Sequence, residues 1–395
     1  MILPWGAAGP GWGGGDFVMD ERLAIWLDRK GTPEELGCLL EQAETAAVPG
    51  ALVLACDGNG FTPAQLDPLL TSSPLPLFGG IFPRIIHGNE LLERGSLVVG
   101  LPDPPRMVYL PNLSDPEADF EEQLDQLVTD TFRDRTMMLF VDGFAQRIGS
   151  FIEALFNVFG LELNYIGGGA GSLSMKRTPC LITGDGLKSD GAMLALLETA
   201  SGVGVSHGWG ALTGPFRVTE SDRNVIRSLE WRPAFDVYHE AVSRHAGRSF
   251  TAADYFDVAK AYPFGIARMG TEQIVRDPLG VGENGELVCV GEVPEGSFVS
   301  ILHGDEQSLL CAAARALELG KAALPAGSTE GIRIAMDCIS RVLFLDRQYG
   351  RELAVLNEGH PRLVGACTIG EIANCGDEYL EFYNKTAVVG VLEQQ

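Results

Sequence analysis

The chain has 395 residues, of which 46% are hydrophobic and 21% are charged, and this is enough for two domains with full hydrophobic cores. Its net charge of −24 disfavours nucleic acids and anionic membranes as partners, whereas a small ligand or a basic protein stays compatible. The sequence contains no apolar run of the roughly 20 residues that a membrane-spanning helix needs, and its N-terminus lacks the basic start of a signal peptide. Its eight cysteines include no C-x-x-C pair, so we expect a reduced, cytoplasmic protein without membrane insertion.

Breaks in the apolar pattern divide the chain into three parts. Residues 1–20 are rich in Gly, Pro and Trp and are predicted to be a flexible leader. An N-terminal domain is expected over 21–220; it opens with a helical segment and contains an acidic, amphipathic helix at 115–130. A C-terminal domain is expected over 221–395, where the apolar runs between 263 and 290 are typical of a meander of strands.

One plan recurs along both domains: an apolar strand that ends in polar residues, a helix, a glycine-rich turn and a closing apolar run. The copies begin at residues 51–58, at 136–143, more weakly at 298–305, and most clearly at 332–341. The repetition predicts a mixed α/β, or α+β, fold. Its two related domains would consist of layered sheets flanked by helices, built from strand-helix-strand-strand units.

Polar side chains gather where the strand of the clearest copy ends. Arg341 is suited to clamp a ligand carboxylate and Asp337 to hold an ammonium group, a combination that fits an amino-acid-like ligand, with the thiol of Cys338 between them. The same residues also fit a structural arrangement. In it, Asp337 caps the next helix and pairs with Arg341, while Cys338 belongs to the core.

The turns that follow add further candidates. Thr368 and Glu371 flank a glycine turn whose N–H groups can hold an anion, although a tight strand connection with Glu371 on the surface fits equally. Asn384 either contacts the ligand or satisfies loop backbone, and Arg276 is expected to hold an anionic group. The predicted ligand-binding set is therefore Arg276, Asp337, Cys338, Arg341, Thr368, Glu371 and Asn384.

Several stretches together resemble the FIST family, named for F-box and intracellular signal transduction proteins. They include Tyr165–Ala170, Trp231–Ala234, Asp337–Arg341 and Tyr383–Thr386, and the resemblance covers roughly residues 35–392. It implies a FIST N-terminal and a FIST C-terminal domain that act as a ligand-binding sensory module. Small ligands such as amino acids are proposed for the family, and one subgroup resembles haem-based nitric oxide sensors that regulate histidine kinases.

The expected function follows from this resemblance. It is a small-ligand-binding sensory module of intracellular signal transduction, with an amino-acid-like molecule or a related metabolite as ligand. No kinase, cyclase or F-box segment is recognisable, so the output is expected to pass through a separate partner such as a histidine kinase or a cyclase. The sequence leaves the oligomeric state open.

A haem-binding nitric oxide sensor is one alternative. Haem needs only one proximal histidine, and His207 and His303 are the candidates, although either is also compatible with a structural role. No histidine pair has zinc-ligand spacing, so no metal site is predicted.

A cysteine-dependent hydrolase is the other alternative. It would use Cys338 or Cys367 beside a histidine such as His303 or His360, with Asp337 to orient the ring. No nucleophile elbow, Walker, H-E-x-x-H or kinase motif accompanies these residues. We therefore expect a protein that is not an enzyme.

Overall fold

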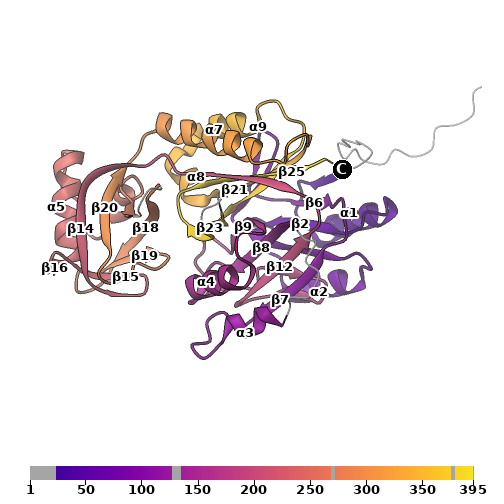
Figure 1. Ribbon diagram of the computed structural model, residues 1–395, viewed down its shortest axis with the longest axis horizontal. Coiled ribbons are helices and arrows are strands. Elements are labelled where there is room, and N and C mark those ends of the chain that lie inside the picture. Colours follow the sequence, from indigo (N-terminus) through magenta and orange to yellow (C-terminus); the bar gives the residue numbers. More distant parts are fainter. Residues whose placement is uncertain (1–23, 127–134, 268–271, 375–378, 395) are drawn as a thin grey trace, which may run out of the picture.

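The computed structural model describes residues 24–126, 135–267, 272–374 and 379–394. The predicted leader at residues 1–20 lies outside them. Figure 1 shows two parts: a large body that contains both the N-terminal and the C-terminal thirds of the chain, and a smaller barrel set beside it. The predicted mixed α+β class with two domains is confirmed. Among the described residues, no helix has both the length and the apolar character needed to cross a membrane.

Three related units of strands form the body. In each unit the first two strands are parallel, a helical crossover joins them, and a third strand returns antiparallel to the first. The three units are β2 (Ala51–Cys56), α2 (Pro63–Ser72), β3 (Leu77–Phe82) and β6 (Ser96–Gly100); β8 (Thr136–Asp142), α4 (Ile148–Phe159), β9 (Asn164–Ala170) and β12 (Gly191–Leu197); and β21 (Glu330–Cys338), α8 (Ile339–Leu345), α9 (Tyr349–Asn357), β22 (Leu363–Thr368) and β25 (Ala387–Glu393). The strand-helix-strand-strand units predicted from the sequence are thus confirmed.

A fourth strand lies beside the returning strand of each unit. It is β1 (Ile25–Asp28) in the first sheet, β7 (Arg106–Pro111) in the second and β13 (Ser201–Ser206) in the third. The segment expected to be helical near residue 25 is therefore a strand, and the helix α1 (Pro33–Thr45) begins after it, with Thr32 as N-cap. The acidic helix is the short α3 (Phe120–Asp125).

The three units exchange hairpins in a cycle. After its second strand, each unit sends a two-stranded hairpin to the sheet of another unit, where it pairs antiparallel with the second strand there. The hairpins are β4 (Arg84–His87) with β5 (Glu90–Leu92), paired to β22; β10 (Leu181–Thr183) with β11 (Gly186–Lys188), paired to β3; and β23 (Glu371–Ala373) with β24 (Glu381–Tyr383), paired to β9. Each sheet is therefore completed by another part of the chain, and the units of the body are interlocked.

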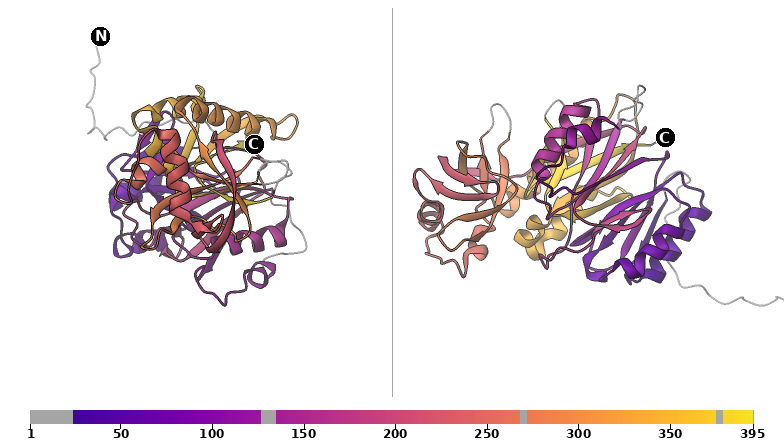
Figure 2. Two further views of the ribbon diagram at one scale, coloured as in Figure 1. Left: turned by 90° about the vertical axis from the view of Figure 1, so that its left-hand side faces the viewer. Right: turned by 90° about the horizontal axis from the view of Figure 1, so that it is seen from below.

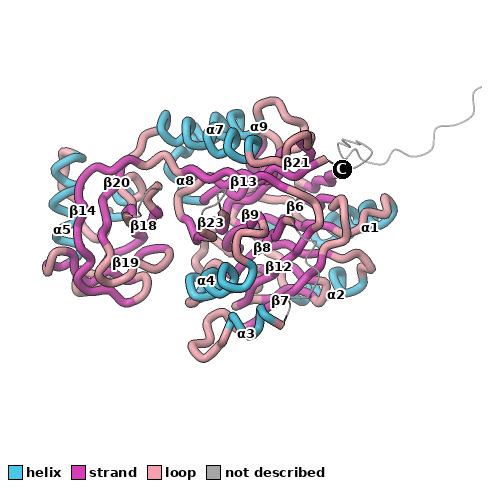
Figure 3. Tube along the Cα trace, in the orientation of Figure 1, coloured by secondary structure: helices cyan, strands magenta, loops and turns pink. Residues whose placement is uncertain are grey.

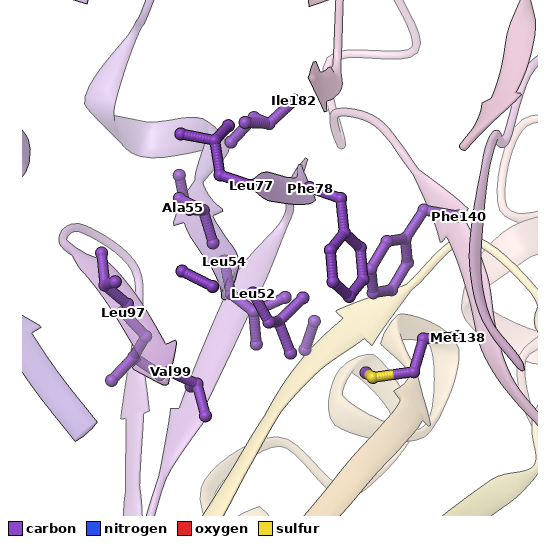
Figure 4. Close-up of a cluster of buried hydrophobic side chains, with 14 of the residues drawn as sticks. Leu52, Leu54, Ala55, Leu77, Phe78, Leu97, Val99, Met138, Phe140 and Ile182 are labelled. Atoms are coloured by element: carbon purple, nitrogen blue, oxygen red, sulfur yellow. The ribbon is translucent and has the colours of Figure 1, made fainter. Parts of the chain in front are cut away.

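One hydrophobic core joins the three sheets. Leu54 and Phe78 of the first unit, Phe140 of the second and Met336 of the third are completely buried in the same cluster. Figure 4 shows Phe78 and Phe140 side by side, and their ring centroids are 6.3 Å apart. Burial of this apolar area is the main force that holds the interlocked units together.

The barrel is inserted between β13 and the third unit. Figure 3 traces the chain from the body into the barrel, and Figure 2 shows the barrel projecting to one side. Its elements are β14 (Gly210–Asp222), β15 (Val225–Leu229), β16 (Arg232–Pro233), α5 (Ala234–Ala246), α6 (Tyr255–Ala259), β17 (Phe264–Ile266), β18 (Ile274–Val281), β19 (Leu287–Val290) and β20 (Phe298–His303). The β14–β15 pairing closes the sheet.

The chain crosses between the body and the barrel twice. It leaves the body at residues 207–209 and returns at 304–305, where α7 (Glu306–Ala322) begins. The division expected at residue 220 falls within β14, a barrel strand. The weak repeat expected at 298–305 is split, because β20 belongs to the barrel and β21 to the body.

A glycine occupies the same position in the second strand of all three units, because neighbouring backbone leaves no room for a side chain. A Cβ there would lie 1.8 to 2.0 Å from a carbonyl oxygen of the paired strand. The three pairs are Gly79 against Val53, Gly167 against Leu139 and Gly365 against Ala335. The glycines of the repeated turns thus allow a close approach of two strands.

Replacing Gly167 with alanine is expected to destabilise the protein by about 3 kcal/mol, because the paired strand holds the opposing carbonyl in place. The matched control is Gly184→Ala in the β10–β11 turn, where an added Cβ has no atom within 4 Å. Its expected effect is within about 0.5 kcal/mol. Urea unfolding measures both variants, and equal stabilities would contradict the packing argument.

Candidate functional site

A cleft of about 1530 Å³ lies between the barrel and the body. From the barrel it is lined by β18 and β19, and from the body by α4, the start of α8 and the turn at 369–370. These elements face one another in Figure 1. The volume is larger than the roughly 300–1,000 Å³ of ordinary ligand pockets and leaves room for a small molecule. Because ligand sites occur preferentially where two domains meet, this cleft is the candidate binding site.

Apolar side chains cover most of the cleft wall. On the body side, α4 presents Ile152 and Phe156, and Leu343 and Ile369 lie next to it. On the barrel side the lining comes from Ile274, Val288 and Val290. A concave apolar wall with a few polar groups is typical of small-molecule sites.

A buried charged network crosses from the barrel to the body beside the cleft. Asp277 of β18 is completely buried and lines the cleft. Its Oδ2 accepts a hydrogen bond of 2.6 Å from the hydroxyl of Ser340, and its Oδ1 lies 3.2 Å from the Nζ of Lys385. Lys385 is also completely buried and donates to the carbonyl of Lys260. Asp277, Ser340 and Lys385 are called the interdomain network below.

Arg276, the neighbour of Asp277, also joins the barrel to the body. Its Nη1 donates to the carbonyl of Phe382 at 2.8 Å, and its Nε donates to the carbonyl of Glu292 at 2.9 Å. Its Nη2 lies 3.4 Å from a carboxylate oxygen of Glu381. Arg276 lines the cleft as predicted, but its guanidinium is engaged by protein groups.

Asn384 presents a buried hydrogen-bond acceptor in the cleft wall. It lines the cleft and is only 1% exposed. Its Nδ2 donates to the carbonyl of Tyr383 at 2.9 Å, whereas its Oδ1 has no hydrogen-bond partner among the described residues. A buried acceptor without a partner costs about 1–3 kcal/mol, so a ligand donor at this point would remove a penalty.

Cys338 lines the cleft beside Ser340 and is buried. Burial, and secondly the charge of Glu371, raise the pKa of this thiol well above its usual value. The thiol form therefore predominates at neutral pH, and this is the less nucleophilic form.

Arg341 and Asp337 lie outside the cleft. The Nε of Arg341 is 3.1 Å from the Oδ1 of Asp337, and its Nη2 is 2.7 Å from the Oε1 of Glu352. It also donates to the carbonyls of His207 and Leu309, which flank the two crossings between barrel and body, and to the carbonyl of Lys385. The ion pair between Asp337 and Arg341 matches the structural arrangement considered in the sequence analysis. Unlike that arrangement, Asp337 makes no capping hydrogen bond to α8.

Two buried carboxyl groups surround Arg341. Burial raises the pKa of Asp337 and that of Glu352, the latter to about 8, even though the guanidinium opposes both shifts. The hydroxyl of Tyr349 donates to Asp337 at 2.6 Å. With one of the two carboxyl groups protonated, the pair would carry the single negative charge that balances Arg341.

Thr368 and Glu371 form a second buried pair behind the cleft wall. The Thr368 hydroxyl donates to Glu371 Oε1 at 2.8 Å, and the Thr386 N–H donates to Oε2 at 3.3 Å. Burial raises the pKa of Glu371 well above its usual value. Glu371 is thus neither on the surface nor in the cleft lining. Of the seven predicted site residues, three line the cleft: Arg276, Cys338 and Asn384.

Imidazoles and metal-ligand clusters are missing from the described part of the cleft. Its lining in residues 24–126, 135–267, 272–374 and 379–394 includes no histidine. His207 is buried at the first crossing, where burial lowers its pKa, and the ring of His303 stacks on Tyr262 in the barrel. Over the same residues, no three His, Cys, Asp or Glu side chains form a group suited to a metal ion.

Asp277, Ser340 and Lys385 were not predicted as a set. Each adjoins or lies within a motif that the sequence singled out: Asp277 follows Arg276, and Lys385 follows Asn384. Two adjacent charged residues, Arg276 and Asp277, within a strand whose other residues are apolar, Gly or Pro are the signal that could have indicated Asp277. Its partners are more than 60 positions away, and such pairing is not readable from one sequence.

Family models match most of the chain. The FIST N domain matches residues 51–232, and the FIST C domain matches residues 234–374. The chain belongs to the FIST family. The predicted family and its two-domain arrangement are confirmed, and the general role of FIST domains is sensory, in signal transduction. No curated protein matches the chain.

The two FIST matches do not coincide with the two spatial parts. Their division, at residue 233, lies at β16 in the barrel. The FIST N match therefore contains the start of the barrel, and the FIST C match contains its remainder and the third unit up to β23. Each FIST domain contributes to both walls of the cleft.

Lys385→Met is expected to destabilise this FIST protein by about 3 kcal/mol, because Asp277 would be left buried without a counter-charge. Adding Asp277→Asn should recover most of that loss. The control Lys321→Met removes an exposed ion pair with Glu358 and should cost less than about 1 kcal/mol. Denaturant unfolding measures all three, and wild-type stability of Lys385→Met would contradict the network.

Glu352→Gln is expected to flatten the pH dependence of stability. The folded protein binds more protons than the unfolded chain between the ordinary glutamate pKa and about 8. The wild-type stability should therefore fall as pH rises through this window. The stability of the variant should fall less over the same window, because glutamine does not titrate.

Thermal unfolding from pH 5 to pH 8.5 measures the difference between the two proteins. Glu318→Gln, which changes an exposed carboxylate on α7, is the control. Parallel curves for wild type and Glu352→Gln would contradict the assignment of a proton to the carboxyl pair.

Proposed function

We propose that this FIST protein binds an amino-acid-like molecule or a related metabolite in the cleft and signals its occupancy to a separate protein. The observation that carries the proposal is the cleft between barrel and body, with the Oδ1 of Asn384 in its wall and no partner for that oxygen in the described part of the chain. A site that leaves a buried acceptor unsatisfied is incomplete without a donor. A bound metabolite would complete it.

The position of the cleft suits a conformational readout. A ligand there contacts the barrel through β18 and β19 and the body through α4 and α8. Among the described residues, the segments 207–209 and 304–305 connect the two parts covalently. A ligand that binds both walls favours one angle between the parts over others, and domain closure of this kind is a common switching device.

The output would reach a signalling partner such as a histidine kinase or a cyclase. The sensory role of FIST domains supports a partner of this kind. The proposed role is not catalytic. Cys338 is held as a thiol, and the described lining of the cleft offers no imidazole to activate it.

Haem is not part of the proposal. His207 and His303, the histidines suggested by the sequence, lie at the first crossing and in the barrel, away from the described lining of the cleft. Haem in the cleft would need an axial ligand other than histidine, and burial keeps the thiols of Cys289 and Cys338 protonated.

A thermal-shift screen with amino acids and related metabolites tests the proposal. At a concentration of about 100 times Kd, a true ligand should raise Tm by about 3 °C. Asn384→Leu, which keeps the side-chain size and removes the acceptor, should abolish that shift. The control Asn284→Leu alters an exposed barrel turn outside the cleft and should preserve it.

The proposal fails if no compound raises Tm. It also fails if Asn384→Leu and the wild type respond equally to every ligand found, since the binding site would then lie elsewhere.

A further inference from the structure

We infer that the cleft selects an amine: a molecule with a protonated amino group, an apolar body and no carboxylate. This inference rests on the proposed function and specifies its ligand class. The inferred ligand differs from an amino acid in one chemical group, the carboxylate. Matched compounds with and without that group can therefore test the inference.

Two oxygen atoms beside the interdomain network can accept hydrogen bonds from a ligand. Among the described residues the Oδ1 of Asn384 has no donor, and the hydroxyl hydrogen of Ser340 is given to Asp277, so only lone pairs are left on the Ser340 oxygen. Asp277 contacts both Ser340 and Lys385, the neighbour of Asn384. A ligand that binds these two oxygens must donate hydrogen bonds, as an ammonium group does.

Carboxylates outnumber cations around the cleft. Its described lining contains five carboxylates and two guanidiniums, and the chain as a whole carries −24. Two further cations pair with lining carboxylates from outside, Lys385 with Asp277 and Arg227 with Asp222. Five carboxylates against four cations still leave an excess of negative charge, which attracts a cationic ligand.

A ligand carboxylate beside Asn384 meets cations that protein groups already engage. Arg341, expected from the sequence to clamp it, lies outside the cleft between Asp337 and Glu352. The guanidinium of Arg276 is engaged by two carbonyl groups and by Glu381. Arg223, the other guanidinium of the described lining, is exposed and donates to Gln146 at 3.3 Å. A carboxylate beside Asn384 would therefore lose its hydration without gaining the guanidinium of Arg276 or Arg341.

The apolar wall accounts for the rest of the ligand. Met175 and Tyr379 line the cleft but are 57% and 64% exposed, and Leu173 and Phe256 are exposed lining residues as well. Exposed apolar side chains that gather around one cavity mark a surface that a ligand covers. An apolar body on the amine would bury these side chains.

Three matched compounds test the inference by isothermal titration calorimetry at pH 7 on the full chain. They share one ring system: tryptamine, tryptophan and indole-3-propionate. Tryptamine should bind at least 10-fold more tightly than tryptophan, and indole-3-propionate should bind most weakly. The phenyl series, phenethylamine, phenylalanine and 3-phenylpropanoate, should give the same order.

Variants connect the preference to the cleft. Asn384→Leu should weaken tryptamine at least 10-fold, and Asn284→Leu should leave it unchanged. Glu292→Gln removes one lining carboxylate and should weaken tryptamine about 3-fold, whereas Glu295→Gln, outside the lining, should not. The glutamine variants keep the test decisive if Asn384→Leu does not fold.

The results separate the inference from the proposed function. If tryptophan or indole-3-propionate binds as tightly as tryptamine, the amine preference is overturned and the ligand cleft stands. If none of these compounds binds while a metabolite in the broad screen does, the inference is again overturned alone. If nothing binds at all, both are overturned.

Discussion

The structure depends on one buried carboxylate. Asp277 belongs to the barrel, and both of its partners, Ser340 and Lys385, belong to the body. A buried charge is tolerated only when paired and hydrogen-bonded, so this contact fixes how barrel and body meet. The cleft lies beside it, which means that the geometry of the candidate site is set by the same contact.

Lys385 connects this contact to the rest of the body. Its side chain reaches Asp277, while its carbonyl accepts from the indole of Trp209 at 3.0 Å and lies 3.4 Å from Arg341 Nη1. Its backbone has a φ of 52°, which is uncommon for a residue with a side chain and persists where surrounding contacts determine it. Arg341 thus supports the cleft wall indirectly. It donates hydrogen bonds to the carbonyls of His207 and Leu309 at the two crossings and to the carbonyl of Lys385.

The sequence predicted the repeated units because their signal is local. Apolar runs, glycine turns and helix periodicity all lie within about 60 residues, and the shared close approach at Gly79, Gly167 and Gly365 reflects the same register in each unit. The site was predicted less well. Asp337 and Arg341 are four positions apart at a strand end, a pattern that fits a ligand clamp and a buried ion pair equally, and only tertiary packing distinguishes them. The cyclic hairpin exchange and the choice of Ser340 and Lys385 as partners of Asp277 depend on distant parts of the chain, and one sequence does not show which distant segments pair.

The central claim is that the ligand lies between the barrel and the body, against Asn384. A crystal structure of the protein with the compound that binds most tightly tests it most directly. We predict ligand density in the cleft, with a donor within about 3 Å of the Asn384 side-chain oxygen and apolar atoms against α4. Density at any other place, with the cleft empty, would contradict the account.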